Sequence, residues 1–153
     1  MDYKSLMQQA ISLAKEAAVK GDVPVGALVV DDSGNIVGQG ANLREQDNDP
    51  TAHAEIVAIR NAANKIGNYR LDDLTMVVTL EPCGMCAGAI LESKISRLIY
   101  GTYNIKLGAV GSVYDIIRDQ RFMNNIEVHG GILEKQCNRV LSEFFKNKRN
   151  EKS

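Results

Sequence analysis

The sequence of 153 residues contains three cysteines and lacks long apolar runs. An odd number of cysteines, two of them three residues apart, does not suit a disulfide framework and favours a metal site or a reactive thiol in a reducing compartment. The longest apolar run, Val23 to Val30, is too short to cross a bilayer. The N-terminal residues show no apolar signal-peptide core. We therefore expect a cytoplasmic protein with no membrane partner.

An excess of one charge is also lacking, because 18 basic residues face 19 acidic ones. A nucleic-acid binder that depends on charge alone is therefore not expected. The charges are unevenly distributed, with a net of −4 in residues 1–76 and +3 in residues 77–153. Residues 146–153 carry four basic groups and one acidic group, which leaves open a small basic binding surface or the solvated end of a helix.

The composition that remains is that of a globular protein, with 44% hydrophobic and 24% charged residues. This balance argues against disorder and against a coiled coil. The length fits one domain, which we take to span residues 1–153, since no linker, repeat or low-complexity segment divides it.

Helical and strand-like periodicities alternate along the chain. Helices are predicted for residues 3–20, 52–66, 82–93, 134–149 and, as a short one, 112–119. Strands are predicted for residues 25–30, 36–41, 74–80, 96–100 and 126–129. The turn sequence at residues 31–35 makes the first two strands a hairpin. The alternation that follows predicts an α/β fold with a largely parallel sheet and helices on both faces.

The last predicted helix carries an apolar stripe. Its members are Leu133, Cys137, Val140, Leu141, Phe144 and Phe145. A cysteine on such a stripe is expected to pack as a small hydrophobic residue.

Two short motifs carry chemistry: His-Ala-Glu at His53 to Glu55, and Pro-Cys-Gly-Met-Cys, which contains Cys83 and Cys86. Each motif alone has several meanings. Together they complete the pattern H-x-E…P-C-x-x-C, which is typical of zinc-dependent nucleobase deaminases.

The spacing of these residues suits a metal centre. Cys83 and Cys86 are three positions apart in the first turn of a predicted helix, so both thiols can face one point, and the helix N-terminus favours their thiolates. His53 is expected in the first turn of its own helix. Three protein ligands leave a tetrahedral zinc ion one open position for water. Glu55 is not placed as a fourth ligand and could carry protons between that water and a substrate ring.

Other interpretations of these residues stay open. His129 or Cys137 could close the zinc site as a fourth ligand and make it structural. Cys83 and Cys86 could be a thioredoxin-like pair, which leaves His-Ala-Glu unexplained. Glu55 could only stabilise the start of its helix.

With these motifs the chain resembles the tRNA-specific adenosine deaminases of the cytidine-deaminase-like superfamily, from about Lys4 to Arg149. The segments that carry the resemblance are residues 22–27, 49–55, 69–71, 79–89, 108–112 and 144–149. The resemblance implies a three-layer αβα fold with a mixed five-stranded sheet and one zinc ion per subunit. It also implies a homodimer that converts the wobble adenosine of a tRNA anticodon stem-loop to inosine.

The same resemblance implies roles for residues outside the zinc motif. Asn42 would hydrogen-bond the target nucleoside, Val25 would line its pocket, and Ala54 is a further substrate-binding candidate. An asparagine that follows a strand can equally well be a turn former.

Lys106 and Arg149 would touch the RNA backbone. Asn104 stands where the family usually has an acidic residue beside the ribose next to the target. An amide keeps an acceptor oxygen but loses the charge, so recognition of a 2′-hydroxyl is weakened.

The segment Asn124-Asn125-Ile126 departs from the family's frequent Asn-His-Arg, and Tyr103 and Leu107 are bulky and apolar for their loop. These departures leave two other functions open. One is a zinc deaminase of a free base such as guanine, of a nucleoside or of single-stranded DNA. The other is a zinc-binding module without catalysis.

Overall fold

The computed structural model describes residues 1–151, so that Lys152, one of the basic groups counted near the C-terminus, lies outside the described residues. The helices are α1 (Tyr3–Val19), α2 (Arg44–Asp47), α3 (Ala54–Ile66), α4 (Gly84–Ser93), the 3-10 turn η1 (Gln120–Phe122) and α5 (Glu134–Glu151). The strands are β1 (Gly26–Val30), β2 (Ile36–Ala41), β3 (Thr75–Leu80), β4 (Arg97–Thr102) and β5 (Glu127–His129).

The five strands form one sheet in the order β2-β1-β3-β4-β5. Strand β1 is antiparallel to both of its neighbours, whereas β3, β4 and β5 are parallel. The expectation of a largely parallel sheet is wrong on the β1 side, because the first hairpin strand inserts between β2 and β3, the strands that α3 connects. The mixed sheet implied by the resemblance is confirmed.

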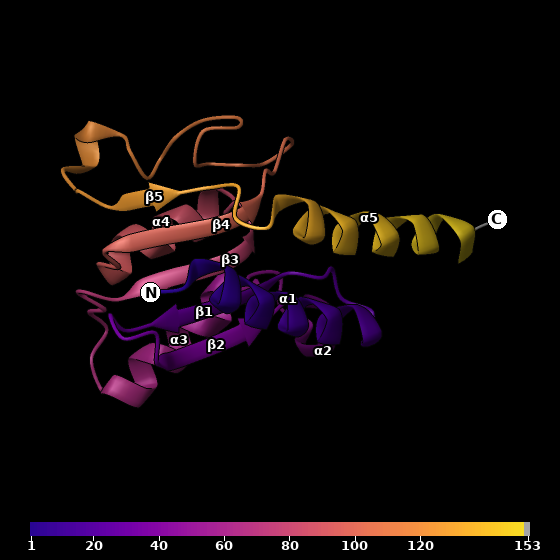
Figure 1. Cartoon of the computed structure of the whole chain (residues 1–153), viewed down its shortest axis with the longest axis horizontal. Helices are drawn as coiled ribbons and strands as arrows, with labels where there is room; N and C mark the ends of the chain where they lie inside the picture. The colour runs from indigo at the N-terminus through magenta and orange to yellow at the C-terminus, as the bar shows by residue number, and fades with distance from the viewer. Residues whose placement is uncertain (152–153) are drawn as a thin grey trace.

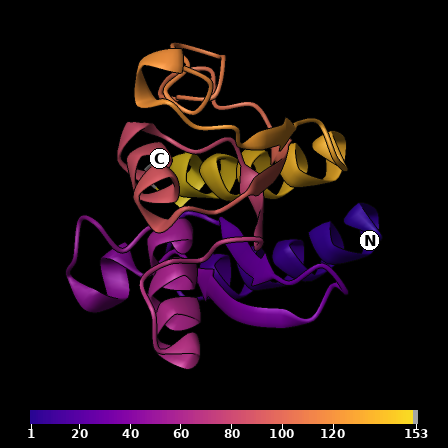
Figure 2. The ribbon, with the colours of Figure 1, turned by 90° about the vertical axis from the view of Figure 1, so that its left-hand side faces the viewer.

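The helices cover both faces of the sheet (Figure 1, Figure 2). Helices α3 and α4 pack on one face, and α1 and α5 pack on the other. An apolar core lies between the sheet and each helix layer. One core contains the alanines of α3, and the other contains Cys137 of α5. The three-layer αβα arrangement is therefore confirmed. Within residues 1–151, none of the helices combines the length and the apolar character needed to cross a bilayer.

Glycines in β2 allow α3 to lie unusually close to the sheet. A Cβ atom at Gly40 would come within 2.6 Å of the Ala54 carbonyl oxygen and 2.7 Å of the Ala58 nitrogen. A Cβ atom at Gly38 would come within 2.5 Å of the Ala62 nitrogen. The backbone of α3, and with it the start of the helix, is therefore positioned by direct contact with β2.

Gly40→Ala is expected to lower the free energy of unfolding by about 3 kcal/mol, because the new methyl group meets backbone atoms that cannot turn away. Urea denaturation at a fixed zinc concentration measures the change. Gly88→Ala is the matched control, since nothing lies within 4 Å of a Cβ at this helical glycine. Equal stability of the two variants would contradict the close packing of α3 on β2.

Buried carboxylates lie at the two main departures from the predicted elements. Residues 112–119 form turns in place of the predicted helix, and the N–H and hydroxyl of Ser112, at their start, donate to the carboxylate of Glu81. Helix α2 forms inside the predicted loop 43–51, because Asp22 accepts hydrogen bonds from the Glu45 N–H at 2.7 Å and the Gln46 side chain at 2.9 Å.

The predicted starts of two helices shift by about two residues. Helix α3 begins at Ala54, and His53 is its N-cap. Helix α4 begins at Gly84, and Cys83 is its N-cap. Both ligands therefore have extended backbone at the helix entrance and do not lie in the first turn.

Candidate metal centre and active site

The candidate metal ligands meet at one edge of the sheet. Strands β2 and β3 run in the same direction, and each is followed by a helix that packs on the same face. Their carboxyl ends share an edge, as in other α/β sheets. His53 precedes α3 and Cys83 precedes α4 at this edge, so the topology brings together residues that are 30 positions apart.

The three predicted ligand side chains converge. The Nδ1 atom of His53 lies 3.6 Å from Sγ of Cys83 and 3.4 Å from Sγ of Cys86. All three ligand atoms lie within 4.8 Å of one another. A tetrahedral zinc ion bound at about 2.3 Å to sulfur and about 2.0 Å to nitrogen requires ligand atoms about 3.6 Å apart. One zinc ion therefore fits the donor set and its spacing.

The two thiols share a proton in a way that suits metal binding. A hydrogen bond from Cys86, aided by His53, lowers the pKa of Cys83 to about 4. The same hydrogen bond and burial raise the pKa of Cys86. Cys83 is thus a thiolate at neutral pH, which is the form that binds zinc.

The fourth-ligand candidates lie elsewhere. Cys137 is buried in the core beside α1, and burial raises the pKa of its thiol to about 11. His129 lies on β5, where its Nε2 is 2.7 Å from the carboxylate of Glu127. Among residues 1–151, the group of His, Cys, Asp and Glu side chains able to hold a metal is His53, Cys83 and Cys86, which leaves one tetrahedral position for a water or a substrate.

Glu55 lies beside this centre in the first turn of α3 and is 4% exposed. Burial is the main cause that raises the pKa of its carboxyl to about 7. A carboxyl group with a pKa close to neutrality can both accept and release a proton during a reaction.

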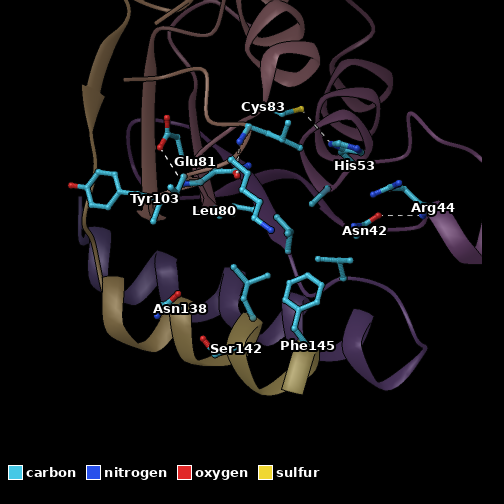
Figure 3. Close-up of a pocket in the computed structure, with 18 of the residues that line it drawn as sticks. Asn42, Arg44, His53, Leu80, Glu81, Cys83, Tyr103, Asn138, Ser142 and Phe145 are labelled. Carbon is cyan, nitrogen blue, oxygen red and sulfur yellow. Dashed lines mark hydrogen bonds between the residues drawn. The ribbon is translucent and has the colours of Figure 1, made fainter. Parts of the chain in front are cut away.

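The centre lies in a cavity of about 750 Å³ that opens to solvent. Figure 3 shows that α5 forms the side of the cavity opposite His53 and Cys83. The segment after β4, which contains Tyr103, forms a further wall. The volume is typical of a site for a small organic molecule or for one extruded nucleotide.

The structure places all six predicted substrate-binding residues in the lining of this cavity. They are Val25, Asn42, Ala54, Asn104, Lys106 and Arg149. Asn42 also has the turn role considered from the sequence, because its Oδ1 atom accepts a hydrogen bond from the Arg44 N–H at 3.2 Å. This contact, drawn in Figure 3, fixes the side chain at the cavity wall.

Sequence reasoning missed several lining residues. Those not proposed for the site include Arg44, Glu81, Asn138, Leu141, Ser142 and Phe145. The last four recur at helical spacing on one face of α5. This periodicity is the signal in the sequence that could have identified them as one surface. Phe145, assigned to the apolar stripe, is 44% exposed and faces the cavity, whereas Cys137 and Val140 pack into the core.

The charged groups of the lining are separated by depth. Four exposed basic residues, Arg44, Lys106, Lys148 and Arg149, surround the cavity, whereas its acidic residues, Glu55 and Glu81, are buried. An anionic ligand that extends beyond the cavity therefore meets cations at the surface.

Comparisons with known proteins agree with this geometry. A tRNA-specific adenosine deaminase of Haemophilus influenzae is 49% identical over 149 residues, which cover 97% of this chain and 86% of that protein. A solved structure of tRNA:A34 deaminases, which perform A-to-I editing at the wobble position, superposes with a TM-score of 0.83 at 36% identity. It covers 90% of this chain and 99% of its own.

The guanine deaminase of Nitrosomonas europaea superposes with a TM-score of 0.79 at 25% identity, covering 92% of this chain and 83% of its own. The family model of the cytidine and deoxycytidylate deaminase zinc-binding region matches residues 1–102, which contain the candidate ligands His53, Cys83 and Cys86 as well as Glu55. The chain has the fold of these deaminases and the donor set for their zinc ion, and it belongs to the cytidine and deoxycytidylate deaminase family.

Proposed function

We propose that this protein hydrolyses adenosine to inosine at the wobble position of a tRNA anticodon. The observation that carries the proposal is the placement of Glu55 and the His53, Cys83 and Cys86 group inside a cavity surrounded by basic side chains. The identity with a relative named for this activity supports the same substrate. The reaction consumes one water and releases one ammonia, with the exocyclic amine of adenine as the leaving group.

His53, Cys83 and Cys86 would hold the zinc ion, which when bound would lower the pKa of a water and so provide the nucleophile. The carboxylate of Glu55 takes one proton from the attacking water and delivers it to the ring nitrogen beside the attacked carbon. It then takes the second proton from the same oxygen, as the carbonyl forms and the carbon–nitrogen bond breaks, and supplies it to the departing amine, which leaves as ammonia. Its burial suits this role, because the pKa of about 7 allows both protonation states.

The cavity walls hold the base for this chemistry. Val25 and Ala54 are buried apolar residues beside the centre, and Asn42 offers its amide nitrogen while its oxygen stays bonded to Arg44. A base must leave its stack to reach such a recessed centre, which single-stranded anticodon loops allow at low cost.

The basic residues around the cavity favour a nucleic acid strand over a free base as the substrate. Lys106 and Arg149 both line the cavity, one on the segment after β4 and one on α5. A free base carries no phosphate for these cations to contact, whereas nucleotides on both sides of an extruded adenosine do. This arrangement supports an anticodon stem-loop as the partner and the cytoplasm, where tRNA acts, as the location. The homodimer stays a prediction.

The test incubates zinc-loaded protein with an anticodon stem-loop that carries adenosine at the wobble position. Its DNA copy, free guanine and a stem-loop with the adenosine moved by one position are treated in parallel. Nucleoside analysis by liquid chromatography then measures inosine and xanthine. We expect inosine from the wobble stem-loop, and little product from guanine or from the displaced adenosine.

Each other outcome points to a different function. Deamination of guanine alone would keep the chemistry and overturn the tRNA substrate. No turnover on any substrate by a zinc-loaded protein would leave the non-catalytic zinc-binding module. Conversion of the DNA copy together with the RNA would place the activity on single strands in general.

The side chain of Asn104 bears on whether the protein distinguishes the RNA stem-loop from its DNA copy. Its Oδ1 atom accepts a hydrogen bond from the Leu107 N–H at 3.1 Å, so the amide nitrogen is the polar group that remains for a substrate. An amide N–H donates and cannot accept a hydrogen bond from a 2′-hydroxyl. We therefore expect Asn104→Asp, which supplies a second acceptor oxygen, to raise the preference for RNA over DNA about tenfold.

The ratio of kcat/KM for the stem-loop and its DNA copy measures this preference. Asn68→Asp is the matched control, because the side-chain oxygen of Asn68 also accepts a hydrogen bond from a nearby backbone N–H, that of Arg70 at 3.0 Å, but Asn68 lies outside the cavity. An unchanged ratio in Asn104→Asp would show that this side chain does not read the sugar.

A further inference from the structure

Glu81 has a buried carboxylate for which the proposed chemistry has no use. It lies between β3 and the N-cap Cys83 and is 1% exposed. Burial of a carboxylate without hydrogen-bond partners is strongly unfavourable. Its partners therefore show what this side chain organises.

Every donor to the carboxylate comes from the segment that follows β4. Oε1 accepts from the Asn104 N–H at 3.2 Å and from the Ser112 hydroxyl. Oε2 accepts from the Val110 N–H at 3.0 Å and from the Ser112 N–H at 3.1 Å. One side chain thus gathers both ends of residues 104–112.

The backbone of the same segment also binds the residues just after β3, which include Cys83 of the candidate metal centre. The Ala109 N–H donates to the Pro82 carbonyl at 2.9 Å, and Gly108 forms an antiparallel bridge with Cys83. A Cβ atom at Gly108 would collide with the Glu81 carboxylate, so the segment closes directly over the side chain.

Residues 103–107 of this segment line the cavity. They include Asn104 and Lys106, which the proposed function assigns to the nucleic acid strand. Figure 3 shows the hydrogen bond of Glu81 directed toward this segment and away from His53. The carboxylate therefore acts on the wall and not on the metal ligands.

We propose that Glu81 is a positioning residue, whose carboxylate holds residues 103–112 as the cavity wall and so sets the affinity for the substrate strand. The part about the strand rests on the proposed function. An amide cannot replace the carboxylate, because each oxygen accepts from at least one backbone N–H. Whichever oxygen of Glu81 becomes an NH₂ group in glutamine, a backbone donor of the segment loses its acceptor.

The test compares zinc-loaded Glu81→Gln with the unchanged protein in two measurements. Steady-state kinetics on the wobble stem-loop are expected to show KM raised about 10- to 100-fold with kcat changed less than about threefold. Hydrogen exchange followed by mass spectrometry is expected to show faster exchange in peptides that contain Asn104, Val110 and Ser112. Zinc content is expected to stay at one ion per chain.

Two further variants keep the test decisive. Ser112→Ala removes a single donor from the exposed end of the segment and is expected to raise KM about threefold, even if Glu81→Gln does not fold. Glu127→Gln is the control for the carboxylate. Glu127 lies on the short strand β5, away from the cavity, and its carboxylate accepts hydrogen bonds from the side chains of Arg97 in β4 and His129 in β5. Ser12→Ala is the control for the hydroxyl, which donates to a carbonyl within α1.

The outcomes separate this proposal from the proposed function. A raised KM with unchanged exchange would overturn positioning in favour of direct contact, and faster exchange with an unchanged KM would reduce Glu81 to a structural role. If the unchanged protein does not convert the stem-loop, the proposed function fails. The exchange measurement then still decides whether Glu81 holds the segment.

Discussion

Glu55→Ala is expected to keep its zinc and its fold while losing turnover by about 10²- to 10⁴-fold, which is the range that proton transfer by one side chain contributes. The physical reason is that Glu55 borders the donor set without belonging to it. Removal of the carboxyl leaves His53, Cys83 and Cys86 in place, and the alanine is a strong helix former within α3. Zinc content, circular dichroism and kcat on the wobble stem-loop provide the three measurements.

Glu16→Ala serves as the control for Glu55→Ala. Glu16 is an exposed carboxylate on α1, on the other face of the sheet, and its removal is expected to leave kcat unchanged. Normal turnover by a zinc-loaded Glu55→Ala protein would contradict the assignment of proton transfer to this residue. Loss of zinc in that variant would make Glu55 part of the metal site.

Cys86→Ala is expected to abolish stoichiometric zinc binding and activity together, and Cys83→Ala is expected to do the same. Two remaining protein ligands do not hold zinc in a site with an open position. Cys86 is fully buried and Cys83 is half-buried, and an alanine at either position offers no donor atom to the metal. Metal analysis of protein purified without added zinc measures the loss directly and does not depend on the substrate.

The third cysteine supplies the control for this measurement. Cys137 is as deeply buried as Cys86 but packs in the core against α1, so Cys137→Ala is expected to keep one zinc ion while losing some stability. Retention of stoichiometric zinc with normal turnover in Cys83→Ala or Cys86→Ala would contradict the three-ligand centre.

The metal centre could be predicted from the sequence because its geometry follows from local rules. Cys83 and Cys86 are close together because one is the N-cap of α4 and the other lies in its first turn, and His53 joins them because both helices start at the same edge of the sheet. No long-range detail had to be known beyond the direction of β2 and β3. The shift of His53 and Cys83 to N-cap positions did not change which atoms converge.

The departures have the opposite origin, since they depend on side chains distant in the sequence. The turns after Gly111 begin at Ser112, whose N–H and hydroxyl donate to Glu81, about 30 positions earlier in the sequence. Helix α2 forms because Asp22 accepts from its first turn. Local propensity contains no information about such partners.

Helix α5 shows a further limit of periodicity. Its apolar residues were assigned to one stripe, yet Val140 contacts the core while Phe145, five residues later, lines the cavity. A stripe wide enough for both faces does not reveal which part packs internally and which part meets a ligand. The position of α5 against the sheet decides between them.

The two edge strands restrict how copies of this protein can associate. Strand β5 has only three residues, and its Glu127 side chain is bound to Arg97 at 2.8 Å. On the opposite edge, the side-chain amide of Asn61 donates to the carbonyl of Gln39 in β2 at 2.8 Å, and so occupies a group that another strand would need. Short, charged or covered edges oppose strand addition and aggregation. A second copy in the predicted homodimer would therefore dock through helices and loops and would not extend the sheet.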